Sequence, residues 1–138
     1  MGSYLNPGSD LFEMALRSQI FVDKSGLIEK TNHCVRTLQR YMCVSRPRRF
    51  GKSMGVDMLA AYYDRSVNTR KLFEGLKIKS TEDYEKHLNQ YDTLTLFNSK
   101  CFFSSSMLLS ANNKSSYVYL VSSIHYLFPR NSMSLYVL

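Results

Sequence analysis

The chain has 138 residues, 44% of them apolar and 21% charged, and this composition excludes a fibre or a fully disordered segment. No apolar run reaches the roughly 18 residues that a membrane-spanning helix needs, and no secretory signal is readable near Met1. Three cysteines are too few and too widely spaced for a disulfide framework or a zinc site. We therefore expect a cytoplasmic protein with reduced thiols and no membrane association. The formal net charge of +7 favours a polyanionic partner.

The first predicted element is a short helix that follows a turn-forming cluster at residues 6–9. Asp10, with Glu13 three residues later, is a candidate N-terminal cap. The apolar side of this helix is expected to contain Leu11, Met14 and Leu16.

A second helix and a strand follow. Residues 20–22 are predicted to be extended, and residues 27–40 are predicted to be helical. The apolar run at residues 41–44 predicts a buried strand, because a proline comes shortly after it. Residues 45–50 form a polar, arginine-rich loop in this interpretation.

The next helix is predicted to start at Ser53 and to end between residues 64 and 68. Its apolar residues recur at a spacing near 3.6: Met54, Met58, Leu59, Ala61 and Tyr62. Ser80 is a candidate cap for a further helix that extends through Asn89. Residues 93–97 alternate β-branched and apolar side chains, which predicts a second strand.

Residues 98–138 differ in character from residues 1–97. They contain eleven serines and three basic residues but no Asp or Glu, although they include strand-favouring patches at 117–121 and 136–138. An ordinary chain is about a quarter charged. We interpret residues 98–138 as an unassigned Ser-rich tail, translated through a frameshift or beyond a rearrangement, with a divergent domain as the alternative.

The sequence feature most informative about chemistry is Gly51-Lys52-Ser53, which lies between a predicted strand and a predicted helix. In a phosphate-binding P-loop, backbone N–H groups surround the phosphates, the lysine reaches them and the hydroxyl ligates Mg²⁺. The full signature requires glycine at position 46, where this chain has Arg46. A tripeptide this short also occurs in ordinary basic turns.

Three arginines precede this tripeptide: Arg46, Arg48 and Arg49. Their guanidinium groups could neutralise a triphosphate. The alternatives are a solvated run of charge and a contact with nucleic acid. Because no basic helix or interleaved aromatic residue accompanies the cluster, the nucleic-acid reading is the weaker one.

The segment CVSRPRRFGKSMGVDMLAAYYD resembles the signature of the AAA-ATPase-like family of bacterial proteins, whose P-loop variant is written RPRRFGKS. Upstream, FVDKSGLIE is similar to the family's VDKT-like segment. Downstream, LFEGLKI and HLNQYDTLTL resemble the family's following stretches. The motif resemblance covers residues 11–96. The resemblance implies that arginine replaces the first glycine of the signature throughout this P-loop variant, as Arg46 does here.

The resemblance implies that ATP and Mg²⁺ are bound, with Lys52 as the phosphate lysine and Ser53 as the magnesium ligand. Gly51 would make the turn into the helix, and the three arginines would flank the phosphates. Members of the family usually place an aspartate where this chain has Phe97. They continue with a Walker B strand and a PD-(D/E)xK nuclease-like domain. The resemblance implies that nucleic acid would be bound through that downstream domain.

The fold prediction is therefore α/β and P-loop NTPase-like, with a helical extension and an incomplete sheet. Residues 1–97 would be the N-terminal part of an AAA-ATPase-like domain, and residues 98–138 the tail. The predicted function is nucleotide binding by a truncated protein, without hydrolysis because a Walker B carboxylate is missing. A basic nucleic-acid-binding module and a non-functional gene remnant are the alternatives.

Overall fold

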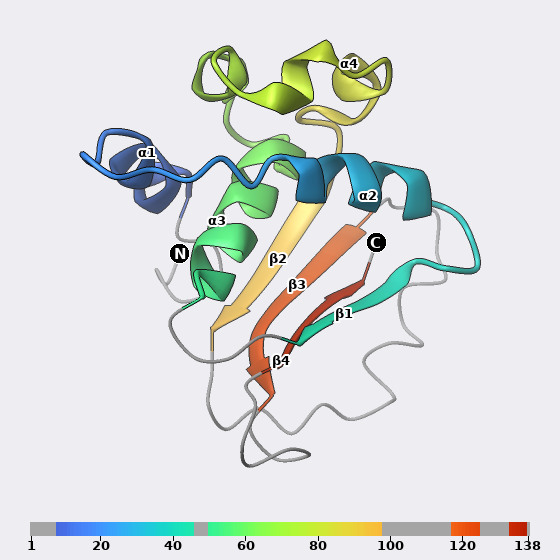
Figure 1. Ribbon diagram of the computed structural model, residues 1–138. Coiled ribbons are helices and arrows are strands. Elements are labelled where there is room, and N and C mark those ends of the chain that lie inside the picture. Colours follow the sequence, from blue (N-terminus) through green and yellow to red (C-terminus); the bar gives the residue numbers. More distant parts are fainter. Residues whose placement is uncertain (1–7, 46–49, 98–116, 125–132, 138) are drawn as a thin grey trace.

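The computed structural model describes residues 8–45, 50–97, 117–124 and 133–137 (Figure 1). The helices are α1 (Asp10–Leu16), α2 (Gly26–Cys34), α3 (Lys52–Tyr63) and α4 (Tyr84–His87). Two short 3-10 helices, η1 (Arg70–Phe73) and η2 (Lys77–Ser80), lie between α3 and α4. The strands are β1 (Tyr41–Ser45), β2 (Asp92–Phe97), β3 (Tyr117–Ile124) and β4 (Met133–Val137).

The four strands form one sheet in the order β1-β4-β3-β2. β2 and β3 are parallel, with Asp92 opposite Tyr117 and Phe97 opposite Ser122. β4 runs antiparallel to both β3 and β1. It follows that β1, β2 and β3 all point the same way, so their carboxyl ends share one edge of the sheet.

This sheet is larger than the sequence predicts. The strands at β1 and β2 are confirmed, and the strand-favouring patches of residues 117–121 and 136–138 lie largely in β3 and β4. The antiparallel β4 stands beside β1, a position where an all-parallel sheet would have another parallel strand. Pairings between strands this distant in sequence depend on tertiary contacts, which local patterns do not contain.

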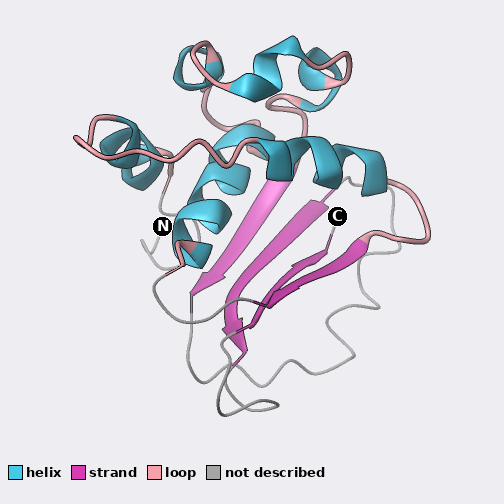
Figure 2. Cartoon of the chain, viewed as in Figure 1, coloured by secondary structure: helices cyan, strands magenta, loops and turns pink. Residues whose placement is uncertain are grey.

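The helices gather on one side of the strands (Figure 2). α3 packs against β2 and β3, while α1 and α2 pack against α3. The core is aromatic: Tyr62 lies in contact with Tyr63, Phe73 and Tyr84, with ring centroids 4.9 to 6.0 Å apart. Such pairs add specific geometry to a large buried apolar area. α3 is thus held firmly between the sheet and the other helices.

The first helix starts one residue earlier than the sequence suggests. Ser9 is the N-cap, its carbonyl accepting a hydrogen bond from the Glu13 amide, so Asp10 is already helical. The buried side chain is Phe12, whereas Leu11 and Met14 are 48% and 68% exposed. Phe12 stacks on Phe73 with ring centroids 5.2 Å apart, and this long-range partner decides which side of α1 is buried.

Two further elements differ from their predicted bounds. α2 ends at Cys34, because the backbone leaves the helical conformation at Val35 and turns at Arg36, whose φ is 60°. The helix predicted from Ser80 to Asn89 is only the short α4, with Asp83 as its N-cap. None of the helices in the described parts of the chain has the length and apolar character needed to cross a bilayer.

A buried hydrogen-bonded chain joins α2 to α3. The Asn32 amide donates to Tyr62 Oη (3.1 Å) and accepts from Tyr63 Oη (2.7 Å), and Thr31 Oγ1 lies 2.8 Å from Tyr63 Oη. Tyr62 Oη in turn donates to the Tyr84 carbonyl (2.8 Å). Burial raises the pKa of Tyr62 and Tyr63, so both stay protonated donors. This chain fixes α3 relative to α2 and to the start of α4.

Candidate functional site

The predicted phosphate-loop residues lie at the start of α3, on the chain that leaves β1. Gly51 is the N-cap of α3, and Lys52 and Ser53 are its first two residues. The Gly51 carbonyl accepts the Gly55 amide at 3.1 Å, which closes the first turn. Because β1 points toward this turn, the site lies at the edge where β1, β2 and β3 end. In open α/β sheets ligands bind at that edge.

The backbone at Gly51 favours glycine, and the ammonium of Lys24 lies close to it. Its φ is +72°, in the left-handed region that favours glycine. A Cβ at this position would also collide with the ammonium of Lys24. That ammonium donates a hydrogen bond to the Phe50 carbonyl at 2.9 Å. The turn into α3 is therefore shaped by a residue 26 positions before it.

A pocket of about 300 Å³ opens beside this turn. Its walls come from three stretches of the chain and comprise Lys24, Leu27, Val44, Phe50, Gly51, Lys52 and Gly55. Its volume is at the low end for small-molecule sites. Two lysines and the amino end of a twelve-residue helix converge on it, and this is a favourable environment for a phosphate group.

The segment that carries Lys24 is itself fixed on its other side. Asp23 accepts hydrogen bonds from the backbone amides of Ser25 (2.8 Å) and Lys77 (3.0 Å). Ser25 Oγ accepts the Ile78 amide at 3.2 Å. Burial tends to raise the pKa of Asp23, but these hydrogen bonds outweigh it and hold the pKa below its usual value. Residues 23–25 therefore connect η2 to the turn before α3.

Two carboxylates, Asp57 within α3 and Asp64 at its C-cap, are partly and fully buried, respectively. Asp64 is buried, at 7% exposure, and its Oδ1 accepts the Ser66 amide. Burial raises the pKa of Asp57 to about 6. Among the described residues, Asp57 Oδ1 has no hydrogen-bond partner. Asp57 is four residues after Ser53, so the two lie on the same side of α3.

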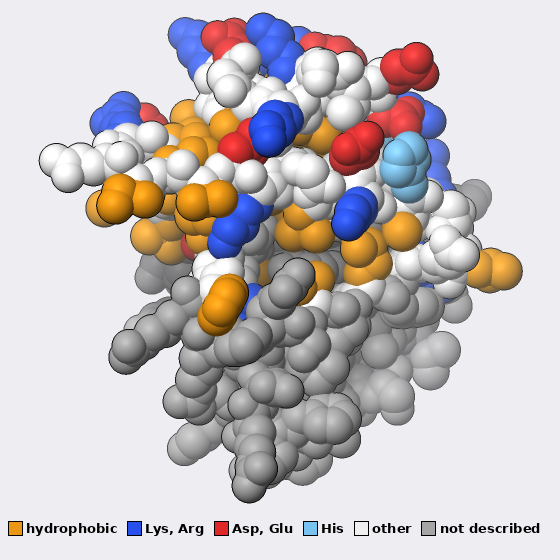
Figure 3. Space-filling view, viewed as in Figure 1, with side chains coloured by type: hydrophobic (Ala, Val, Ile, Leu, Met, Phe, Trp, Pro, Cys, Tyr) orange, Lys and Arg blue, Asp and Glu red, His pale blue; other side chains and the backbone are white. Residues whose placement is uncertain are grey.

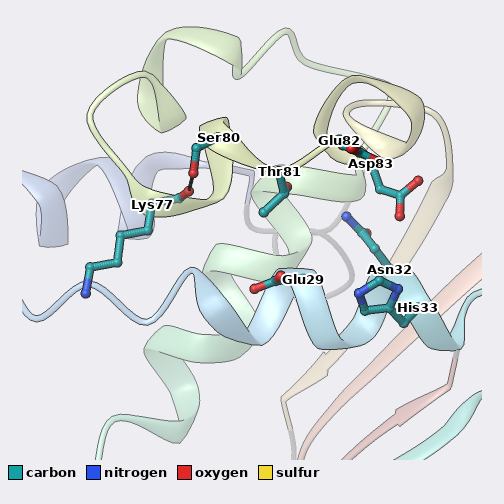
Figure 4. Close-up of a pocket in the computed structure, with 8 residues that line it drawn as sticks. All are labelled: Glu29, Asn32, His33, Lys77, Ser80, Thr81, Glu82 and Asp83. Atoms are coloured by element: carbon teal, nitrogen blue, oxygen red, sulfur yellow. Dashed lines mark hydrogen bonds between the residues drawn. The ribbon is translucent and has the colours of Figure 1, made fainter.

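A larger pocket, of about 540 Å³, lies between α2 and the segment from η2 to α4 (Figure 4). It is lined by Glu29, Asn32, His33, Lys77, Ser80, Thr81, Glu82 and Asp83. Three of these side chains are carboxylates, the Asn32 amide is already bonded to Tyr62 and Tyr63, and Ser80 Oγ donates to the Lys77 carbonyl. An anionic nucleotide is repelled by such a lining, so the pocket beside Gly51 is the better phosphate site.

The predicted arginine cluster of Arg46, Arg48 and Arg49 lies outside the described residues. On the face shown in Figure 3, acidic and basic side chains alternate over the upper helical region instead of gathering into one basic patch.

No group of three His, Cys, Asp or Glu side chains suited to a metal ion occurs within the described ranges. His87 is buried, with Nδ1 2.6 Å from Tyr91 Oη.

A family model described as "Predicted AAA-ATPase" matches residues 9–126. The chain belongs to this predicted AAA-ATPase family. The match continues beyond Leu96, where the resemblance of individual motifs ends, and it includes all of β3. No curated protein and no solved structure matches the chain.

Sequence reasoning did not assign a role to Asp23 and Lys24 in this predicted AAA-ATPase. The signal was present, because both belong to the VDK segment that resembles the family upstream of the P-loop. The sequence does not reveal which distant residues these two contact. In the structure Lys24 lies against Phe50 and Gly51, and Asp23 lies against η2. The upstream stretch thus contacts two others that resemble the family, at the turn before α3 and at η2.

Proposed function

We propose that this predicted AAA-ATPase binds Mg·ATP at the turn from β1 into α3, in a P-loop NTPase-like arrangement. The observation that carries the proposal is the pocket beside Gly51, where Lys24, Lys52 and the start of α3 converge. Family membership and the shared edge of β1, β2 and β3 support it. Residues 1–97 would supply this site, and the division of the chain at residue 97 stays a prediction.

The residues present fit the phosphate end of the ligand. The left-handed Gly51 lets the backbone approach a phosphate closely, and Lys52 would contribute a charge-assisted hydrogen bond. Ser53 is exposed in the first turn of α3, where its hydroxyl would ligate Mg²⁺. Arg46, Arg48 and Arg49, four to seven residues before Ser53, would flank the phosphates, as the family resemblance implies.

We further propose that the chain binds ATP without hydrolysing it at an enzymatic rate. Hydrolysis requires a carboxylate that positions Mg²⁺ and a group that orients water, usually from strand ends beside the phosphate loop. β2 ends at Phe97 and β3 at Ile124, and neither residue can act in these ways. Asp92 lies at the opposite end of β2. Asp57 is the nearest carboxylate in sequence to Ser53 on the same side of α3.

The test is the affinity of the chain for a fluorescent ATP analogue with Mg²⁺, compared with that of Lys52→Ala. A charge-assisted phosphate contact contributes roughly 1.5–3 kcal/mol, so the affinity should fall at least about tenfold. Lys30→Ala is the matched control, because Lys30 is an exposed lysine on α2 that does not line the pocket. The control should bind as the wild type does.

Three results would contradict the proposal. Equal affinity of Lys52→Ala and wild type would reject the assignment of the site. Salt-sensitive binding of DNA that persists in Lys52→Ala, without ATP binding, would favour the nucleic-acid module instead. Turnover near 1 s⁻¹ (about the lower end of enzymatic rates) that Lys52→Ala abolishes would reject the absence of hydrolysis. It would also direct attention to Asp57.

A further inference from the structure

Lys24 has a position that the P-loop pattern does not account for. It belongs to none of the residues from 46 to 53, yet its ammonium donates to the Phe50 carbonyl and lies where a Cβ of Gly51 would be. It also lines the pocket together with Lys52. Its ammonium thus touches both the backbone of the turn and the pocket beside it.

The hydrogen bond from Lys24 constrains the turn before α3 at the peptide bond between Phe50 and Gly51. The Phe50 carbonyl belongs to the peptide bond that leads into Gly51, so the hydrogen bond from Lys24 fixes the orientation of that peptide. The same peptide carries the Gly51 N–H, and its orientation determines the direction of that donor. Holding this peptide before a ligand arrives reduces the conformational freedom that binding must otherwise remove.

The backbone on both sides of Lys24 is anchored, so the lysine is a fixed support. Asp23 is bonded to the Lys77 amide and Ser25 to the Ile78 amide, both at the start of η2. Ser25 is fully buried and Lys24 is only partly exposed. The lysine side chain therefore reaches the turn before α3 from a fixed backbone position.

We propose that Lys24 is a positioning residue of the phosphate site, which braces the Phe50–Gly51 peptide against the anchored 23–25 segment. The ligand part of this inference rests on the proposed nucleotide binding. The bracing part concerns the chain without any ligand. An ammonium has three donors, and one of them is used by the Phe50 carbonyl.

The experiment measures amide hydrogen exchange of the ligand-free chain, followed by binding of the fluorescent ATP analogue, in Lys24→Met and Lys24→Arg. In Lys24→Met, exchange of a peptide covering residues 50–56 should rise about tenfold, since a charged hydrogen bond to a backbone carbonyl is lost. Exchange of residues 77–81 should stay unchanged, because Asp23 and Ser25 hold that segment. Lys24→Arg should restore part of the protection.

Affinity for the ATP analogue should fall about tenfold in Lys24→Met and recover partly in Lys24→Arg, with no change in the melting temperature. Lys30→Met is the matched control and should change neither measurement, because Lys30 is exposed and lies outside the pocket. The combination of unchanged melting and localised exchange separates positioning from a general structural role.

The inference is overturned if exchange at residues 50–56 is the same in Lys24→Met and in the wild type, whatever the affinities are. It is also overturned if exchange rises throughout the chain together with a lower melting temperature. Absence of ATP binding in the wild type would reject the proposed function. In that case the exchange data would still decide whether Lys24 braces the turn.

Discussion

The contact between α2 and α3 and the contact between residue 24 and the turn before α3 are built in opposite ways. The first joins side chains that are almost fully buried, and its hydroxyl and amide groups are bonded to one another. The second is a single hydrogen bond from Lys24 to the backbone carbonyl of Phe50, a residue that is 61% exposed. Both contacts act on the same helix.

The difference separates stability from function along α3. Residues 55–63 of the helix are largely buried, so their contacts contribute to the free energy of unfolding. The first turn borders a pocket, and its proposed contribution is to shape a binding site. Substitutions at the two places should therefore change different measured quantities.

The largest effect on stability is expected from Asn32→Ala. The substitution removes the hydrogen bonds of Asn32 with Tyr62 Oη and Tyr63 Oη in the buried interior, while the contacts of these hydroxyls with the Tyr84 carbonyl and Thr31 Oγ1 remain. Because each lost hydrogen bond contributes roughly 1 kcal/mol, the free energy of unfolding should fall by about 2 kcal/mol. Urea unfolding monitored by circular dichroism measures this change.

His33→Ala is the control for this substitution, because His33 is the next residue of α2 and is exposed. It should leave the unfolding midpoint almost unchanged. If Asn32→Ala were no more costly than His33→Ala, the buried hydrogen-bonded chain would not be a main source of stability.

The elements that the sequence predicts correctly are those with a strong local pattern. The apolar spacing of Met58, Leu59 and Tyr62 identifies α3, and the short apolar runs identify β1 and β2. Local patterns fail where a distant partner decides. Leu11 and Met14 have the helical spacing expected of a core, but Phe12 is buried because Phe73 stacks on it.

The candidate site is predictable in part for the same reason. Gly51, Lys52 and Ser53 are adjacent in sequence, so their motif locates them at the start of a helix. The role of Lys24 depends on a contact across 26 positions, and no spacing rule contains it. Whether residues 98–138 are in frame stays a prediction, which the encoding DNA after the codon for Leu96, read in the other two frames, would test.

An intermediate effect is expected from Gly51→Ala. A non-glycine residue at φ +72° costs about 1–2 kcal/mol, and the new Cβ must also displace the Lys24 ammonium. Gly75→Ala is the control, because nothing lies within 4 Å of a Cβ at that glycine. Urea unfolding should show a clear loss for Gly51→Ala and almost none for Gly75→Ala.

The Gly51→Ala substitution also tests the contact between Lys24 and the Phe50–Gly51 peptide. In a Lys24→Ala background the displacement of the ammonium no longer contributes, so Gly51→Ala should cost less there than in the wild type. Strictly additive costs would mean that the Lys24 ammonium moves aside without cost when a Cβ is added at position 51.

The smallest effect, and the one most dependent on pH, is expected from Asp57→Asn on the middle of α3. Burial raises the pKa of Asp57 from its ordinary 3.8 to about 6 in the folded chain. At about pH 4 and below the carboxyl is largely protonated in the folded state, so burial has little cost. Between about pH 4 and pH 6 the unfolded chain releases this proton first, so the contribution of Asp57 to stability decreases as the pH rises.

Above about pH 7 the folded chain holds a buried carboxylate, and the cost of this charge is at its maximum. A shift of two pKa units corresponds to about 3 kcal/mol, but partial contact with solvent should reduce the cost to about 1 kcal/mol. Asparagine carries no charge at any pH. Asp57→Asn should therefore be more stable than the wild type by about 1 kcal/mol near pH 7.5, and this gain should disappear near pH 4. Urea unfolding at both pH values, with the exposed Glu82→Gln as control, measures the difference. An equal gain at both pH values would mean that the effect comes from packing. The charge of Asp57 would then make no contribution to the free energy of unfolding.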